Sequence, residues 1–314
     1  MTLLQGDGVS VIIPVRDATQ SLGRQLRALA QQIDAPPFEV TLVDNGRNGN
    51  LAARFREDAA QLTVRVADAT SAPGTAFARN VGIGNTTAPK LLFCDADDVV
   101  GPTWVRDGAA ALDEVPVFSG GAVPFTPAEL SGPLEDVWGL LAQRLPGYVE
   151  AAADMPAGTY PVLLGCSFGA RRSVLLELGG FDEGFGSQAE DNDLAFRAQK
   201  LLGTLPRAAH VAVAYRIRPG HETSLRRAFS AGFAHAELCA RHDAWHLSPS
   251  RQGRWVLRPL KEIVTGRGVM SSRADVVGRL VGLVAGRAWF TLVRPTRARS
   301  GSSCRADHDT TSRP

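Results

Sequence analysis

The first third of the chain alternates strand-like runs with helix-like stretches, and this alternation restricts the folds that the sequence can adopt. Runs rich in apolar and β-branched residues lie at 9–15, 38–45, 63–68 and 90–98. The stretches between them read as helices and lie at 21–33, 51–62 and 74–87. Alternation of this kind predicts a parallel sheet with helices on both faces. We therefore expect an α/β fold.

The rest of the chain is less regular but still carries element signals. The glycine pair at 120–121 predicts that the strand over 116–125 crosses close to other backbone. Further expected elements are a helix near 134–145, a strand, turn, helix and glycine-rich turn over 160–186, a helix over 189–203, a strand over 208–218 and a helix over 224–243.

Composition is that of an ordinary globular protein. The 314 residues can bury a sizeable core, and 44 % hydrophobic with 21 % charged residues is typical of soluble chains. The net charge of +2 gives no indication of nucleic-acid binding. Cysteines 94, 166, 239 and 304 are far apart and form no CxxC pair, which argues against a zinc site and a disulfide framework.

The C-terminal region has a different character. From Arg251 to Arg299 basic residues outnumber acidic ones, of which Glu262 and Asp275 are the only two. The apolar stretch within 259–293 is interrupted by arginines, so we expect it either to touch a membrane surface or to cover the main domain. Residues 299–314 are polar and are expected to be disordered.

Targeting signals are lacking in the sequence. The N-terminal residues "MTLLQGDGVS" show neither the basic start nor the apolar run of a signal peptide. No uncharged apolar stretch reaches the ~18 residues that a spanning helix needs. We expect a cytoplasmic protein, with peripheral contact to the inner face of the membrane through 259–293.

Three predicted strands end in polar residues, namely Arg16 and Asp17, Asp44 and Asn45, and residues 95–98. In sheets of this kind ligands bind at the carboxyl ends of the strands, so these side chains predict a binding cleft. The alternative is that each strand simply ends in a polar turn.

The acidic cluster in "LLFCDADDVVGP" is the most unusual of these ends. Three aspartates, Asp95, Asp97 and Asp98, follow an apolar strand directly. Carboxylates this close repel one another, so a positive partner is expected. A divalent metal, an arginine and bulk water around a solvated turn are all compatible with the residues.

Six segments resemble, in order, the motifs of the family 2 glycosyltransferases with a GT-A fold. They are "VSVIIPVRDA", "FEVTLVDNG", "GTAFARNVGI", "LLFCDADDVVGP", "LGCSFGARRSVLLELGGFDE" and "AEDNDLAFR", and they cover roughly residues 8–245. The resemblance implies a GT-A fold, which is a Rossmann-like mixed sheet flanked by helices. It also implies inverting, metal-dependent transfer of a sugar from a nucleotide diphosphate to an acceptor hydroxyl.

The resemblance implies roles for the acidic cluster. Asp97 matches the direct ligand of Mn²⁺ or Mg²⁺, and Asp95 matches a contact to the ribose or to a metal-bound water. Asp98 would support the turn. A divalent ion held by few carboxylates suits the neutralisation of a leaving diphosphate. His221 is the best-placed candidate for an added metal ligand, and an exposed loop histidine is the alternative.

Other matching positions divide between donor and acceptor. Pro14 and Arg16 match the nucleotide-binding turn, Asp44 a carboxylate that accepts the base N–H, and Arg79 a basic residue near the nucleotide. Asp191 matches the general base, and a base is needed to remove the acceptor proton.

The acceptor side is completed by neighbouring motifs. Glu190 would orient the acceptor, and Asp193 fits the preference of a helix start for acids. Residues 165–167 match an acceptor-side loop, and 179–182 are expected to shape the turn beneath the cleft.

We expect a glycosyltransferase domain over 1–248, with a nucleotide-sugar half at 8–115 and an acceptor half at 116–248, then a basic helical extension at 249–298. The acceptor would be a glycan, a lipid-linked molecule or a small molecule, as in cell-envelope or glycan biosynthesis. Single-sugar transfer is favoured because the QxxRW signature of processive synthases and spanning helices are both lacking. The alternatives are a nucleotidyltransferase, although "VIIPVRDATQS" lacks its glycine-rich loop, and a degenerate transferase that only binds.

Overall fold

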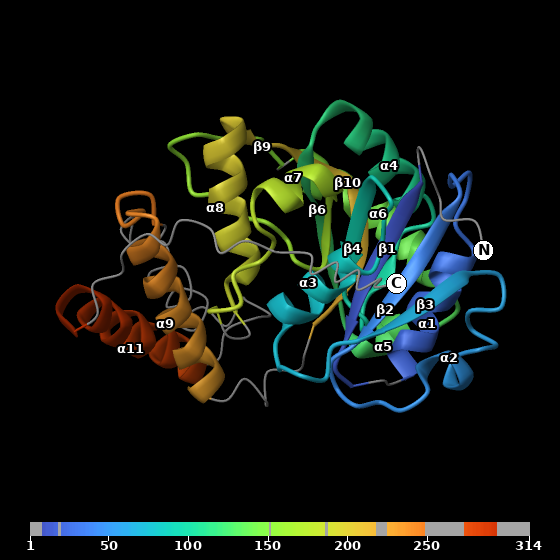
Figure 1. Ribbon diagram of the computed structural model, residues 1–314, viewed down its shortest axis with the longest axis horizontal. Coiled ribbons are helices and arrows are strands. Elements are labelled where there is room, and N and C mark those ends of the chain that lie inside the picture. Colours follow the sequence, from blue (N-terminus) through green and yellow to red (C-terminus); the bar gives the residue numbers. More distant parts are fainter. Residues whose placement is uncertain are drawn as a thin grey trace, which may run out of the picture.

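A mixed eight-stranded sheet forms the centre of the protein, and helices cover both of its faces (Figure 1). The computed structural model describes residues 8–17, 20–150, 152–185, 188–217, 225–248 and 273–293. The mixed α/β architecture expected from the sequence is confirmed.

The sheet has a parallel half and a mixed half. Its strands are β1 (Val9–Val15), β2 (Phe38–Asp44), β3 (Thr63–Asp68), β4 (Lys90–Cys94), β5 (Val99–Val100), β6 (Val117–Phe125), β8 (Ser167–Arg171) and β10 (Arg207–Arg216). Their order is β3-β2-β1-β4-β8-β6-β10-β5. Strands β1 to β4 are parallel, whereas β8 runs antiparallel to both of its neighbours. Two short strands, β7 (Met155–Pro156) and β9 (Thr204–Leu205), pair separately.

Helices follow the strands in nearly the expected order. They are α1 (Gln20–Ala30), α2 (Leu51–Arg54), α3 (Thr75–Gly84), α4 (Trp104–Glu114), α5 (Pro127–Ser131), α6 (Leu134–Glu150), α7 (Arg172–Glu177), α8 (Glu190–Leu202), α9 (Leu225–Arg241) and α11 (Arg273–Ala288), with a π-helical end η2 (Trp289–Val293). The helix expected over 51–62 is wrong in length, because the chain continues after Phe55 as separate turns. Helix α5 was not expected, and a capping box at Thr126 and Glu129 starts it.

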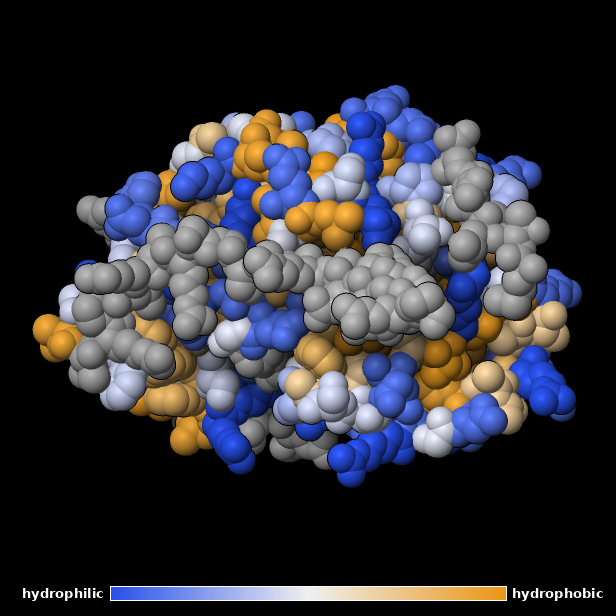
Figure 2. Space-filling model, viewed as in Figure 1, coloured by the Kyte–Doolittle hydropathy of each residue, from blue (hydrophilic) through white to orange (hydrophobic). Residues whose placement is uncertain are grey.

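The last two helices form a hairpin at one end of the molecule, at the left in Figure 1. Helix α9 lies between α8 and α11 in this view. Apolar residues are visible at the surface of this end of the molecule in Figure 2. Within the expected extension at 249–298, the structure describes 273–293; the tail at 299–314 lies outside the described residues. No helix in the described part of the chain is long and apolar enough to cross a membrane.

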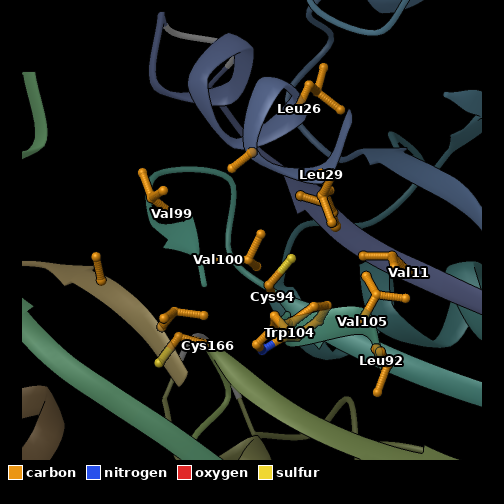
Figure 3. Close-up of a cluster of buried hydrophobic side chains, with 14 of the residues drawn as sticks. Val11, Leu26, Leu29, Leu92, Cys94, Val99, Val100, Trp104, Val105 and Cys166 are labelled. Carbon is orange, nitrogen blue, oxygen red and sulfur yellow. The ribbon is translucent and has the colours of Figure 1, made fainter. Parts of the chain in front are cut away.

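Alternate residues of the central strands enter separate apolar clusters. Val11 packs with Leu26, Cys94 and Trp104 under α1 and α4 (Figure 3), whereas its neighbour Ile12 belongs to a second cluster. This period of two is what a strand buried on both faces requires. The second cluster includes Phe93 and Phe168, whose rings stack with centroids 4.3 Å apart.

The close approach of backbone predicted at the glycine pair is confirmed. A Cβ atom at Gly120 would lie 2.6 Å from the carbonyl oxygen of Val211, and one at Gly121 would lie 2.2 Å from that of Ala209. The register of β6 with β10 shifts at this point, between Arg207 and Ala212. Larger side chains at these two positions would therefore separate the strands.

Candidate functional site

An open cavity lies beside the carboxyl ends of β1 and β2, where the polar residues at the strand ends led us to expect a cleft. Its volume is about 280 Å³, and it is lined by Arg16, Asp17, Asn45, Gly46, Arg47, Thr70, Ala72 and Pro73. The side chains of Arg16 and Arg47 are exposed. Guanidinium groups at the rim of a cavity suit an anionic ligand such as a phosphate.

The loop after β2 shapes this cavity through neutral hydrogen bonds. The Asn45 amide donates to the carbonyl of Ala72 at 2.7 Å and accepts from the Gly74 N–H at 3.0 Å. Gly46 meets the end of β1 so closely that an added Cβ would lie 1.4 Å from the Arg16 carbonyl oxygen. Only glycine fits there without movement of the loop.

Asp44, expected to accept a base N–H, is engaged by the same loop. Its Oδ1 accepts from the Gly46 N–H at 2.9 Å and from the Asn48 side chain at 2.8 Å, and its Oδ2 accepts from the Asn48 N–H at 3.0 Å. If a nucleotide base binds here, the Asp44 carboxylate would accept a hydrogen bond from the base in addition to those from the loop. Pro14 lies in β1 opposite Val43.

The acidic turn after β4 combines open and buried carboxylates. The Asp95 side chain is 37 % exposed, whereas the Asp98 residue is buried. Oδ1 of Asp98 accepts from the Arg216 N–H at 2.8 Å, and the Arg216 Nε donates to the Asp97 carbonyl at 2.9 Å. Burial, reinforced by the charges of Asp95 and Asp97, raises the pKa of Asp98 well above its ordinary value. Asp98 thus fastens the turn to β10.

Arg79 joins this turn to the first turn of α8. It is 2 % exposed, and its Nη1 donates to Glu190 Oε1 at 2.9 Å. Its Nη2 donates to the Gly165 carbonyl at 2.9 Å and lies 3.5 Å from Asp95 Oδ1. The guanidinium carbon lies 5.3 Å from the centre of the Phe181 ring. We expected Arg79 near the nucleotide, and the structure places it inside the protein between two acids, away from the lining of the cavity.

The start of α8 is held in an unusual backbone conformation. Ala189, just before the helix, has a φ of 72°, which costs a non-glycine residue about 1 kcal/mol or more. The Asp193 N–H donates to the Ala189 carbonyl at 2.8 Å and so holds this conformation. Strained backbone of this kind is common beside functional groups.

Asp191 has the electrostatic character of a base that works near neutral pH. Burial and the neighbouring Glu190 charge raise its pKa to about 6, and the Arg79 charge and the backbone N–H groups of Asn192 and Gly165 oppose this rise. The Asn192 N–H donates to Asp191 Oδ1 at 2.7 Å. Of the two adjacent acids, Glu190 is therefore the one paired with Arg79, while Asp191 can exchange a proton.

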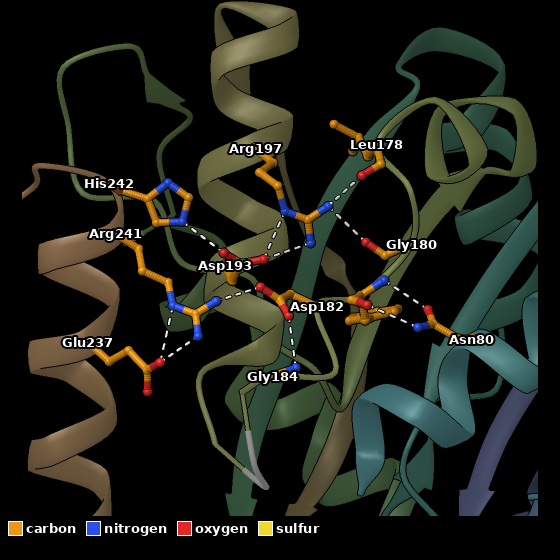
Figure 4. Close-up of polar contacts among 11 residues, drawn as sticks. Asn80, Leu178, Gly180, Asp182, Gly184, Asp193, Arg197, Glu237, Arg241 and His242 are labelled. Carbon is orange, nitrogen blue, oxygen red and sulfur yellow. Dashed lines mark hydrogen bonds and ion pairs between the residues drawn. The ribbon is translucent and has the colours of Figure 1, made fainter. Parts of the chain in front are cut away.

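Asp193, which we expected only to favour the helix start, connects α8 to α9 (Figure 4). It accepts from Arg197 Nε and from His242 Nε2, both at 2.8 Å. Burial alone would raise the pKa of Asp193, but the His242 hydrogen bond and the Arg197 charge hold it below its ordinary value. Beside it, Arg241 pairs with Asp182 at 2.5 Å. We call Arg241 and His242 the α9 clamp; no local sequence signal marked either residue.

Two other acceptor-side motifs prove to be structural. The Ser167 hydroxyl is buried, donates to the Val211 carbonyl at 2.8 Å and accepts from Trp104 Nε1 at 3.1 Å, so it faces the core. Gly180 has a φ of 73°, and an added Cβ would lie 2.6 Å from Asn80 Oδ1. Glycine is therefore required at position 180, where the turn packs against Asn80 of α3.

The residues expected to bind a metal fall partly within and partly outside the described residues. His221, the candidate for an added ligand, lies outside the described residues. Among the residues that the structure describes, no group of three or more His, Cys, Asp or Glu side chains is arranged to hold a metal ion. A metal at the acidic turn would thus depend on ligands from elsewhere, such as a phosphate.

Comparison with known sequences identifies related proteins. The family described as "Glycosyl transferase family 2" matches residues 10–179, which is more than half of the chain. "Glycosyltransferase AglE" of Haloferax volcanii is 31 % identical over 123 residues, 38 % of this chain and 40 % of that protein. "O-antigen biosynthesis protein RfbC" of Myxococcus xanthus is 27 % identical over 228 residues, 70 % of this chain and 16 % of that protein. The chain matches less than half the length of either relative.

Solved structures share the fold. A mannosyltransferase from Pyrobaculum calidifontis, in complex with GDP-Man and Mn²⁺, superposes with a TM-score of 0.55 at 17 % identity, over 90 % of this chain and 83 % of that one. Staphylococcus aureus TarS 1-349, in complex with UDP-GlcNAc, gives 0.51 at 18 % identity, over 90 % and 91 %. The fold is therefore the GT-A fold that the motifs implied.

Proposed function

The chain belongs to glycosyl transferase family 2, and we propose that it moves a single sugar from a nucleotide-diphosphate sugar to an acceptor hydroxyl with inversion. The observation that carries this proposal is the link through Arg79 between Asp95, at the end of β4, and Glu190, at the start of α8. The buried Arg79 guanidinium thereby connects the acidic turn, which suits the leaving diphosphate, to the acids of α8, which suit the acceptor.

For the donor, we propose that the nucleotide lies over β1 and β2, in the cavity rimmed by Arg16 and Arg47. Pro14 supports the turn beneath it, and Asp44 accepts a base N–H beside its loop partners. Arg79 acts from the interior as a positioning residue, because its guanidinium already holds two carboxylates.

The acidic turn fits a divalent cation. Asp95 is partly open to solvent, and the buried Oδ2 of Asp98 has no hydrogen-bond partner among the described residues. Carboxylate oxygens are the ligands that Mn²⁺ and Mg²⁺ prefer. We propose that Asp97 binds the ion directly, that Asp95 contacts a bound water or the ribose, and that His221 adds a ligand. When bound, the ion neutralises charge on the departing diphosphate.

For the acceptor, we propose that Asp191 is the general base. As the acceptor oxygen forms its bond to the anomeric carbon, the bond from that carbon to the phosphate oxygen breaks. The acceptor proton passes to Asp191, and the nucleoside diphosphate leaves. A pKa of about 6 leaves Asp191 deprotonated at neutral pH yet basic enough to take a proton. Glu190 holds Arg79 and orients the acceptor.

A donor screen tests this function. Thermal unfolding with Mn²⁺ should reveal one nucleotide sugar that stabilises the protein, and slow release of its nucleoside diphosphate should follow. UDP- and GDP-sugars are the first choice because the two structural neighbours bind such donors. If no donor stabilises the protein and none releases its nucleoside diphosphate, the result would favour the alternative of an inactive binding protein.

The metal assignment needs a separate measurement. Calorimetry should show Mn²⁺-dependent binding of the nucleoside diphosphate that is lost in Asp97→Ala. The matched control is Asp113→Ala, which removes a largely exposed acid that pairs with Lys90. Equal binding with and without Mn²⁺ in the wild type would show that the acidic turn does not act through a metal.

A further inference from the structure

The α9–α11 hairpin is held together by a row of glycines. Gly278, Gly282 and Gly286 recur every fourth residue of α11 and all face α9. An added Cβ at Gly282 would lie 2.0 Å from the Phe229 carbonyl oxygen, and one at Gly232 of α9 would lie 2.1 Å from that of Arg279. The glycine face of α11 therefore packs directly against α9.

Another face of α11 is apolar and uncovered by the described residues. Val277, Val281 and Val284 are 52 %, 54 % and 68 % exposed, and they recur at i, i+4 and i+7 as one stripe. Trp289 and Leu292 continue the exposed apolar surface into η2. Single exposed valines need no explanation, but a contiguous stripe indicates a binding surface. We call these five residues the α11 face; the hairpin that bears it lies at the left end of the view in Figure 2.

The charges around the α11 face are positive. Arg279 and Arg287 are exposed, and Asp275 is the only acidic residue in the sequence of α11. The guanidinium carbon of Arg287 lies 4.9 Å from the centre of the Trp245 ring. An exposed valine stripe with Arg287 at its edge, a second arginine on the opposite side of the helix and a tryptophan at one end is the composition of a helix that lies in a lipid interface. A second copy of the chain would instead bring like charges together.

We propose that the α11 face docks on the surface of a bilayer that contains anionic lipid. The valines and Leu292 enter the boundary between headgroups and acyl chains, while Arg287, at the edge of the valine stripe, meets lipid phosphates. This inference is independent of the proposed activity, because the face carries none of the proposed site residues. The α9 clamp connects the docked hairpin to the start of α8.

Vesicle flotation of the full-length protein tests this proposal. The protein should float with vesicles of mixed phosphatidylglycerol and phosphatidylcholine, remain unbound with phosphatidylcholine alone, and be released by high salt. Val281→Asp/Val284→Asp should lower the vesicle-bound fraction by about tenfold or more. The matched control is Leu176→Asp/Leu201→Asp, which alters apolar residues of similar exposure elsewhere and should bind as the wild type does.

The outcomes separate the occupants of this face. If the aspartate pair lowers the melting temperature, Val281→Ser/Val284→Ser tests the same face without added charge. Failure of the wild type to float, or equal loss of binding in the control pair, overturns the proposal. A wild-type dimer in light scattering that the aspartate pair converts to a monomer, without lipid binding by either, would assign the face to a second copy instead.

Discussion

The regions proposed to bind the donor and the acceptor are built by different means. On the proposed donor side, the loop after β2 is fixed by the Asn45 amide and by the Asp44 carboxylate, which accepts from neutral N–H groups, while Arg16 and Arg47 are exposed at the rim. On the proposed acceptor side, Arg79 and Glu190 form a buried ion pair, and each is the counter-ion of the other.

This difference determines how each side responds to change. A hydrogen bond between neutral groups contributes about 1 kcal/mol and one to a charged group about 1.5–3 kcal/mol, so the loss of a single bond in this loop should leave the fold intact. Removal of one member of a buried ion pair costs about 3–5 kcal/mol, because the remaining charge stays in a poorly solvating interior. We therefore expect the polar side chains of the proposed donor side to tolerate substitution one at a time and the buried ion pair of the proposed acceptor side to fail as a unit.

The largest effect is expected for Arg79→Met, which leaves Glu190 buried without a counter-ion. The free energy of unfolding should fall by about 3–5 kcal/mol in urea titrations, and turnover should be lost as well. The double variant Arg79→Met/Glu190→Gln removes both members of the ion pair, so it should regain most of the stability but not the activity. A double variant as unstable as the single one would show that Arg79 acts by packing against Phe168 and Phe181.

Asp191→Asn should follow in size, because it keeps the shape and removes the basicity. Turnover should fall by about 10²–10⁴-fold, with affinity for donor and metal nearly unchanged. The wild-type rate should rise with pH through about 6, where Asp191 loses its proton, and the variant should lack this rise. Loss of donor binding in calorimetry would instead place Asp191 in the nucleotide site.

Asp191→Asn should lower turnover but raise the free energy of unfolding. Folding raises the Asp191 pKa from 3.8 to about 6, so the folded state binds the proton more tightly than the unfolded chain. Stability is therefore lost as pH rises between these two values and stays lower above them. At pH 7 Asp191→Asn should be more stable than the wild type by about 3 kcal/mol, and near pH 3 the two should be alike. Equal stability at both pH values would contradict the raised pKa.

A smaller effect is expected at the α9 clamp. His242→Ala removes a hydrogen bond to the Asp193 carboxylate and the stacking on Phe196, whose ring centre lies 4.7 Å away. Unfolding should become easier by about 1.5–3 kcal/mol, the usual contribution of a hydrogen bond to a charged group. His246→Ala, at an exposed position, is the control and should change little. Equal behaviour of the two variants would mean that the clamp does not hold α8.

Local patterns predicted the elements well and the charge network poorly. The strand at 9–15 has the predicted bounds because its β-branched residues also fit a buried central strand. The Glu190–Asp191 pair could be found because it is contiguous in the sequence. Its partner Arg79 lies 111 residues earlier, and no local pattern reports a contact made across the fold.

Residues that serve the core are equally hard to assign from sequence. Ser167 appeared to belong to the acceptor loop, but its hydroxyl bonds to Trp104 and Val211 inside the sheet. Asp44 ends a strand as expected, yet its oxygens are taken by the loop that follows. In both cases the residue lies in the predicted element, but the direction of its side chain depends on tertiary packing, which a local pattern does not report.

The smallest effect on the fold should come from the donor rim, where Arg16→Gln/Arg47→Asn removes both exposed charges. Arg47 has a φ of 57°, a conformation that asparagine tolerates better than most residues, so the variant adds no backbone strain. Affinity for the nucleoside diphosphate should fall by about three- to tenfold at low salt, and by less at high salt, because exposed ion pairs are screened. The free energy of unfolding should stay within about 0.5 kcal/mol of the wild-type value. A loss of stability as large as that of Arg79→Met would show that the rim, like the acceptor side, is built on charges that the fold requires, and the contrast between the two sides would then be wrong.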